Sequence, residues 1–157
     1  MKLKELVSAE MPLIASGVPG GYDAMLLADL AARAFGETKR AVMHVASDDG
    51  RMMALKNAVR FFAPKLEIVE FPAWDCLPYD RVSPQGDIIA KRMAALARLS
   101  TRRLKAPLLV ITTVNAALQR VPTPGAVADA TFHAEPGDEV DMVALTDFLA
   151  SNGYNRS

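Results

Sequence analysis

Short apolar runs recur along the chain and predict the strands of a buried sheet. Their approximate bounds are 12–16, 40–46, 66–71 and 107–112. The first, second and fourth runs are continuous rather than alternating, a pattern typical of strands that helices cover on both faces. The pattern therefore favours a parallel sheet.

Apolar residues at helical spacing fill the intervals between these runs. The predicted helices are 23–35, 51–62, 84–104 and the short 114–120. Gly36 is expected to end the first helix, and the turn 47–50 offers an N-cap to the second. Ser83 and Pro84 are expected to begin the third, as cap and first helical residue. Because strands and helices alternate, the predicted fold class is α/β, a parallel sheet with helices on both faces and right-handed crossovers.

A change of composition after Gly125 predicts a second domain. Residues 128–134 alternate loosely and predict a strand, and 141–151 have the pattern of an amphipathic helix. We therefore divide the chain into an α/β domain, 1–125, and the beginning of a second small α+β domain, 126–157. One strand and one helix do not complete a domain, so we expect either that the carboxyl end is a boundary within a longer protein or that this piece leans on the first domain.

The totals of this 157-residue chain give no argument for a nucleic-acid or membrane partner, because Lys and Arg number 18 and so do Asp and Glu. Cys76 is the only cysteine, which excludes an internal disulfide and fits a reducing compartment. The amino terminus lacks the apolar core of a signal peptide, and no apolar run approaches the ~18 residues of a membrane span. These features predict a cytoplasmic protein without membrane contact.

The turn after the first predicted strand lies where a phosphate-binding loop would lie. Such a loop reads Gly-x-x-x-x-Gly-Lys-Ser/Thr, where backbone N–H groups and the lysine bind phosphate and the hydroxyl holds magnesium. Counted from Gly17, the lysine position is Asp23, which repels phosphate, and the hydroxyl position is Ala24, which cannot hold a metal. A structural turn with no bound cofactor is therefore expected. Its residues are Gly17, Gly20, Gly21, Tyr22, Asp23 and Ala24.

The most unusual stretch is 71–87, which gathers three prolines, a tryptophan, a tyrosine and three aspartates. Prolines lower the entropic cost of ordering a loop, and its aromatic side chains can anchor it. The carboxylates Asp75, Asp80 and Asp87 could act as acid–base or metal residues. No histidine lies near them in sequence, so turn and cap roles are favoured.

The remaining chemically versatile residues give no sign of a catalytic site. Cys76 would need a base to act as a nucleophile, and neither His44 nor His133 is placed in sequence to suggest a dyad. Two histidines and one cysteine do not predict a zinc site. His44 is expected in the core or at the sheet edge, so the sequence predicts a binding or docking module rather than an enzyme.

A basic run follows the unusual stretch, on the third predicted helix. It consists of Lys91, Arg92, Arg98, Arg102, Arg103 and Lys105. A solvated helix face with cations near the helix carboxyl end is the favoured interpretation. The alternative is a nucleic-acid-binding domain that contacts a phosphate backbone through this helix.

Two groups of residues resemble the amino-terminal part of Mfd, the bacterial transcription–repair coupling factor family. The first group is Trp74, Leu77, Pro78, Tyr79, Asp80, Ser83, Pro84, Asp87 and Arg92; the second is Gln119 and Arg120. The resemblance implies that 1–125 is similar to the first domain of UvrB, domain 1a, with a degenerate P-loop at Gly17. It implies that 126–157 begins the UvrA-docking second domain.

The resemblance also implies a function. The family protein is an ATP-dependent DNA translocase that removes stalled RNA polymerase and recruits UvrA. RNA polymerase and DNA would bind through domains that this chain lacks. The expected function is a non-catalytic scaffold or docking module in transcription-coupled nucleotide excision repair, with UvrA and the other domains of the full-length protein as partners. The remaining alternative is an active UvrB-like or helicase-like nucleotide-binding domain, which Asp23 and Ala24 argue against.

Overall fold

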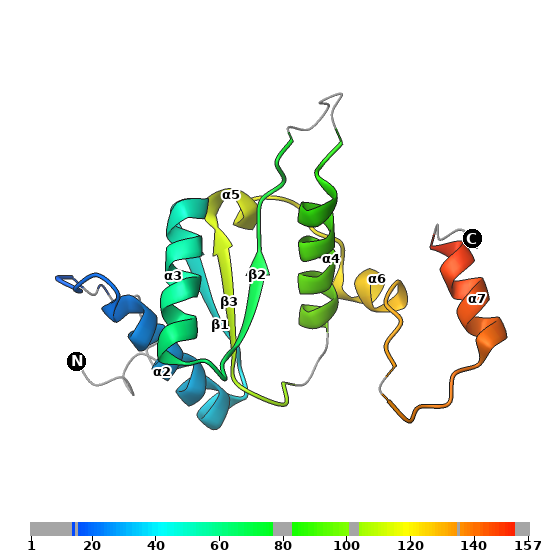
Figure 1. The fold of residues 1–157 in the computed structure, drawn as a ribbon, viewed down its shortest axis with the longest axis horizontal. Helices are drawn as coiled ribbons and strands as arrows, with labels where there is room; N and C mark the ends of the chain where they lie inside the picture. Colours follow the sequence, from blue (N-terminus) through cyan, green and yellow to red (C-terminus); the bar gives the residue numbers. More distant parts are fainter. Residues whose placement is uncertain (1–13, 15, 77–82, 101–103, 135, 153–157) are drawn as a thin grey trace. The chain divides into compact units, whose positions relative to one another are not determined.

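The computed structural model describes residue 14 and residues 16–76, 83–100, 104–134 and 136–152. These form two compact units, Met1–Arg120 and Val121–Ser157, whose division falls a few residues before the expected one at 125. The helices and strands are shown in Figure 1. In chain order they are α2 (Tyr22–Thr38), β1 (Val42–Ala46), α3 (Asp49–Phe62), β2 (Glu67–Phe71), α4 (Gly86–Ser100), β3 (Leu108–Thr113), α5 (Val114–Ala117), α6 (Pro124–Asp129) and α7 (Met142–Ser151).

The three described strands form a parallel sheet in the order β1-β3-β2. Val42 pairs with Leu109 and Phe71 with Thr112 across the two ladders. Every residue of β3 is buried, because this strand is central and carries helices on both faces. The continuous apolar run thus correctly predicted a buried parallel strand, and the α/β class is confirmed.

Helices cover the two faces of the sheet and build two cores (Figure 1). Helices α2 and α3 pack on one face, where Val59, Leu109 and Ile111 are almost fully buried. Helix α4 packs on the other face, where Val69, Leu108 and Val110 are buried. Alternate residues of β3 therefore belong to opposite cores, as the period of two in a strand requires.

Local capping explains most helix bounds. The Asp48 carboxylate accepts the Arg51 backbone N–H at 2.8 Å and begins α3, as the turn 47–50 suggested. Helix α2, in contrast, continues through Gly36 and ends at Lys39, whose φ of 57° is left-handed. The Lys39 and Arg40 N–H groups bond the Phe35 and Ala34 carbonyls there. The Thr38 hydroxyl also donates to the Ala34 carbonyl at 2.8 Å and so bridges the turn that contains Gly36. The prediction that Gly36 ends the helix was therefore wrong.

Helix α4 begins at Gly86 and not at Pro84. The Gln85 carbonyl accepts from the Ile88 and Ile89 N–H groups, so Gln85 is in the cap position that the sequence assigned to Ser83. The fixed φ of Pro84 also suits the extended segment before a helix, which is why its position alone does not fix the start.

Two predicted strands are not observed in the described residues. Of the run 12–16, only Ile14 and Ser16 are described; neither is in a strand, and Ile14 is 93% exposed. The rest of that run lies outside the described residues. Residues 128–134 are not a strand either. Residues 128 and 129 belong to α6, which begins after Thr123 accepts the Ala126 N–H and Pro124 takes the first helical position. Residues 130–134 are in neither a helix nor a strand.

None of the helices in the described part of the chain is long and apolar enough to cross a membrane.

Candidate functional site: a buried arginine at the carboxyl edge of the sheet

The unusual stretch begins where β2 leaves the sheet at its carboxyl edge. Phe71, the last residue of β2, and Pro72 are buried, and Trp74 is half-buried. The Thr112 hydroxyl of β3 donates to the Phe71 carbonyl at 2.8 Å. The exit of β2 is therefore held against the central strand, and this fixes where the tryptophan lies.

Arg92 of α4 reaches this exit and is only 1% exposed. Its guanidinium lies between two aromatic rings, with Cζ 4.2 Å from the Phe71 ring centre and 4.3 Å from that of Trp74. Its Nη1 donates to the Pro72 carbonyl at 2.6 Å. A planar cation enclosed by two rings gains from cation–π attraction, which is strongest when water is excluded.

Gln119 completes the cluster from the segment after α5. Its Oε1 accepts from Arg92 Nη1 at 3.0 Å and from the Trp74 backbone N–H, also at 3.0 Å. One amide oxygen therefore joins three segments that are far apart in sequence. We call Phe71, Trp74, Arg92 and Gln119 the arginine cluster; three of its four members belong to the predicted signature residues.

The electrostatics of the arginine cluster are unusual. No carboxylate among the described residues forms an ion pair with Arg92, and its Nε is buried without a hydrogen-bond acceptor in that part of the chain. Burial lowers the pKa of Arg92 from its ordinary value, although an arginine remains cationic at neutral pH. Because the guanidinium is out of reach of solvent, the arginine cluster is suited to holding the fold and not to touching a substrate.

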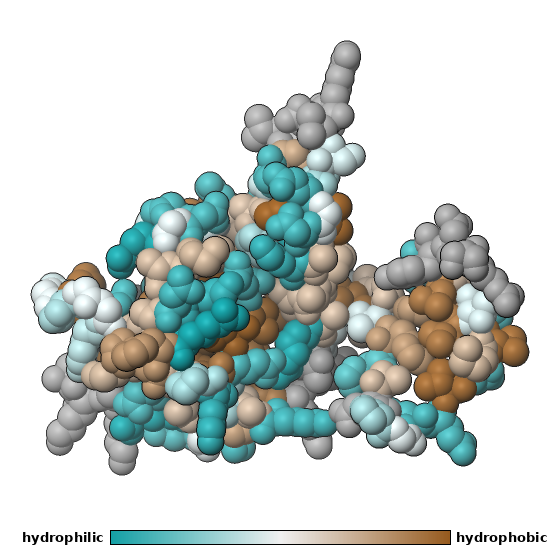
Figure 2. Space-filling view, in the orientation of Figure 1, coloured by the Kyte–Doolittle hydropathy of each residue, from teal (hydrophilic) through white to brown (hydrophobic). Residues whose placement is uncertain are grey.

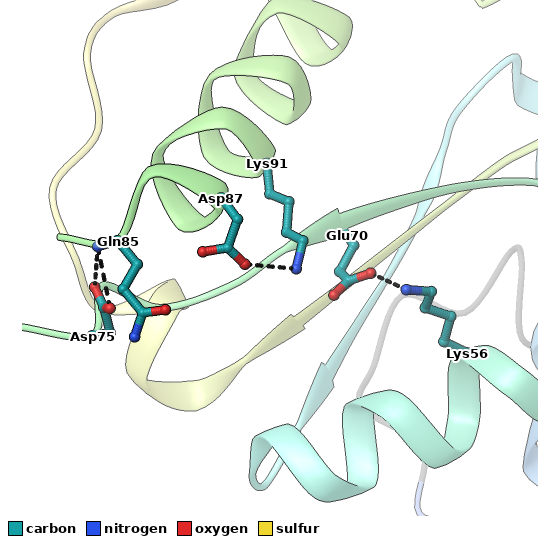
Figure 3. A network of polar contacts seen from close by, with 6 residues as sticks. All are labelled: Lys56, Glu70, Asp75, Gln85, Asp87 and Lys91. Carbon is teal, nitrogen blue, oxygen red and sulfur yellow. Dashed lines mark hydrogen bonds and ion pairs between the residues drawn. The ribbon is translucent and has the colours of Figure 1, made fainter.

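Further polar contacts lie at the start of α4 and between α3 and β2 (Figure 3). Both carboxylate oxygens of Asp75 accept the Gln85 N–H, at 3.3 and 3.2 Å, and close the stretch onto the helix start. Asp87 pairs with Lys91 at 3.4 Å, one turn further along α4. Lys56 of α3 pairs with Glu70 of β2. Asp75 and Asp87 therefore have structural partners rather than forming a carboxylate pair.

The other signature residues that the structure describes make no hydrogen bond or ring contact with the arginine cluster. Ser83 and Arg120 are exposed, and Pro84 is half-buried. Leu77, Pro78, Tyr79 and Asp80 lie outside the described residues. Sequence reasoning did not single out Phe71 as a site residue. The available signal was its position as the last residue of an apolar strand directly before a proline.

The glycine turn before α2 has the backbone of a tight turn. Gly17 and Gly21 have φ values of 69° and 85°, which a side chain would disfavour. The Asp23 carboxylate accepts the Ala24 N–H at 2.9 Å and pairs with Arg51 at 3.4 Å. Ala24 is fully buried in the core. An internal carboxylate thus occupies the helix start that an anion would need.

His44 lies close to this turn, on the edge strand β1. It is half-buried, and burial lowers its pKa below the ordinary 6.5, with a smaller lowering from Arg51 and an opposing effect from Asp23. Hydrogen bonds from the Arg51 N–H and the Ser47 hydroxyl lower the pKa of Asp48. Within the described residues, no group of three His, Cys, Asp or Glu side chains is placed to hold a metal.

The described cations of the basic run are largely engaged within the chain. Arg92 is buried, Lys91 pairs with Asp87, and Arg98 makes a two-pronged bond to Glu67 with N···O distances of 2.5 and 2.8 Å. Glu67 raises the pKa of Arg98. Arg102 and Arg103 lie outside the described residues. The described part of the run therefore does not form a row of free positive charges.

These features define a small parallel α/β domain whose conspicuous motif is a buried arginine cluster, joined to a separate second unit. No protein-family profile matches the chain. Curated relatives do match it. The transcription-repair-coupling factor of Rickettsia bellii is 30% identical over 120 residues, which cover 76% of this chain and 10% of that protein.

Two further relatives carry the same name. The transcription-repair-coupling factor of Escherichia coli is 29% identical over 135 residues, 86% of this chain and 11% of the relative. The transcription-repair-coupling factor of Haemophilus influenzae is 26% identical over 141 residues, which cover 90% of this chain and 12% of that relative. The chain therefore belongs to the transcription-repair-coupling factor family, as the counterpart of one segment that spans about a tenth of its relatives' length.

Proposed function

We propose that this chain is a non-catalytic scaffold that helps to recruit UvrA to stalled RNA polymerase during transcription-coupled nucleotide excision repair. The observation that carries the proposal is the similarity to transcription-repair-coupling factors over most of the chain. In this proposal the first unit is a UvrB-like domain and the second unit begins the UvrA-docking domain. Motor activity and contacts with RNA polymerase and DNA belong to other domains of the full-length protein.

The first unit supports a scaffold role through its internal contacts. The arginine cluster ties the exit of β2, helix α4 and the segment after α5 into one body. That segment leads directly into the second unit, which starts at Val121. A unit held together by its own contacts and followed in the chain by a docking unit is consistent with a recruiting module.

The glycine turn supports the absence of nucleotide chemistry. We infer that it is a degenerate P-loop, in which Asp23 takes the place of the phosphate-binding lysine and accepts an N–H at the start of α2. Bringing a phosphate next to this carboxylate would place like charges together in a partly desolvated site. We expect titration of the chain with ATP and magnesium to give no binding heat.

The test of the proposal is binding of purified UvrA to the immobilised chain, measured by interferometry beside a longer chain that includes the following residues of the full-length protein. Binding by either chain supports the recruiting role, and binding by the longer chain alone would place the contacts after Ser157. Absence of binding by both folded chains would refute it. A duplex DNA titration from 50 to 300 mM salt is run in parallel, because steeply salt-dependent binding would favour the nucleic-acid alternative.

A further inference from the structure

The charges of the chain are divided unequally between its two units. Residues 121–157 contain six acidic residues and one basic residue, a net charge of −5, whereas the chain as a whole is neutral. The first unit therefore carries +5. An acidic segment of this size attracts positively charged partners and repels negatively charged ones. The zero total charge conceals this asymmetry.

The second unit also contains a pocket with an apolar floor. Phe132 and Phe148 line it, with ring centres 5.9 Å apart and planes inclined at 47°, and Leu145 of α7 adjoins them. The cavity volume is about 580 Å³. In Figure 2 the surface of α7 shows a continuous apolar area. No residue of α7 is buried by the described residues, so within them this helix presents apolar surface that another segment can cover.

Three carboxylates, together with His133, also contribute to the lining of the pocket. Asp138, Glu139 and Asp141 all line the pocket, and Glu139 is exposed. Asp141 caps α7 by accepting the Val143 and Ala144 N–H groups, which holds its negative charge at the rim. A lysine or arginine side chain has the matching chemistry, because its apolar stem can lie on the phenylalanine rings while its cationic head meets the carboxylates.

We propose that this pocket is a docking site for a basic, amphipathic segment of a partner protein, with a lysine or arginine beside an apolar side chain. The proposal rests on the docking role of the second unit proposed above and names the chemistry of its partner. The acidic residues that line the pocket repel nucleic acid and acidic peptides.

The first experiment uses the full chain labelled with ¹⁵N and a synthetic twelve-residue peptide with lysine and leucine at helical spacing. A control peptide carries glutamate in place of each lysine. We expect the lysine peptide to shift the amide signals of Phe132, Leu145 and Phe148, and the glutamate peptide to leave them unchanged. Equal binding of both peptides, or shifts confined to other residues, would overturn the proposal. So would concentration-dependent shifts of these signals without peptide, which would mean that a second copy fills the pocket.

Charge reversal supplies a matched pair of variants. Glu139→Lys changes the pocket rim, and Asp147→Lys makes the same charge change on α7 away from the pocket lining. We expect Glu139→Lys to lower the affinity for the lysine peptide about tenfold, equivalent to about 1.4 kcal/mol of binding free energy. We expect Asp147→Lys to lower that affinity less than threefold. If both variants weaken it equally, the attraction is only the general charge of the unit and the pocket has no role.

UvrA binding by the same variants separates the two proposals. Weaker binding of UvrA to Glu139→Lys than to Asp147→Lys supports both. If UvrA binds both variants and the unchanged chain equally, the recruiting function stands but this pocket does not take part in it. Peptide binding at the pocket without any UvrA binding retains the docking chemistry and overturns the proposed partner.

Discussion

Replacing Arg92 by alanine tests whether the arginine cluster holds the first unit together. Arg92 is 1% exposed and bridges the Pro72 carbonyl and the Gln119 amide. The change removes both bonds and the packing between the Phe71 and Trp74 rings. Gln119 keeps its bond from the Trp74 N–H, but the buried Pro72 carbonyl loses its charged donor.

The expected loss follows from three contributions and one offset. Leaving a buried carbonyl without a donor costs about 1–3 kcal/mol, and desolvated cation–π contacts contribute about 2 kcal/mol. Removing the buried aliphatic stem costs about 2 kcal/mol more. One effect acts in the opposite direction. In the unchanged chain the Arg92 guanidinium, with its unpaired Nε, is kept out of water at a free-energy cost. Replacement by alanine removes this desolvation cost of several kcal/mol. We therefore expect a net destabilisation of about 3 kcal/mol, within the range for disrupted buried networks.

The assay is urea unfolding followed by far-UV circular dichroism, because Trp74 is the only tryptophan and its emission would report the mutated site directly. With a slope of about 2 kcal/mol per molar urea, the midpoint should fall by about 1.5 M. The control is Arg98→Ala on the same helix, where loss of the partly exposed pair with Glu67 should cost at most about 1 kcal/mol. Equal losses in the two variants would refute the structural role of the cluster.

Three further predictions concern other parts of the chain. A double-mutant cycle with Gln119→Ala and Arg92→Ala should show a coupling of about 0.5–3 kcal/mol, because the two side chains share a hydrogen bond; simple additivity would contradict it. Burial lowers the pKa of His44 in the folded chain below 6.5. As the pH falls, His44 of the unfolded chain therefore takes up a proton before His44 of the folded chain does. The free energy of unfolding should consequently fall as the pH drops through 6.5 towards the folded pKa. His44→Gln should remove this part of the pH dependence, and an unchanged profile would exclude His44 as its source. Asp141→Ala should destabilise α7 by about 1 kcal/mol through loss of its cap, measured as about fivefold faster amide exchange along the helix, whereas Asp147→Ala, which caps nothing, should not.

The sequence predicted the fold where hydrophobic pattern and burial agree. The continuous run in β3 correctly indicated a central strand, and the turn before α3 correctly indicated its cap. The pattern failed where a local sequence fits two structures. Residues 128–134 alternate like a strand, but the cap at Thr123 and the proline after it favour α6 over 128 and 129, and the described residues of the second unit include no strand.

The candidate site was only partly predictable. The resemblance selected Trp74, Arg92 and Gln119, but nothing in the sequence shows that one amide oxygen would join the other two residues. Arg92 was assigned to a solvated basic face because a cation on a helix is usually exposed. Its burial depends on Phe71 and Trp74, which lie about twenty residues earlier in the chain, and such long-range packing is not encoded in helical periodicity.

The carboxyl edge of a parallel sheet is where α/β proteins usually bind their ligands, and this chain fills that edge with its own side chains. Asp23 lies at the start of α2 and pairs with Arg51. Arg92 donates hydrogen bonds to the Pro72 carbonyl and the Gln119 amide oxygen. These charged groups are therefore engaged in contacts within the domain. A pocket lined by apolar and acidic side chains lies in the second unit, which is why partner binding is sought there and why loss of the arginine cluster should affect stability more than docking chemistry.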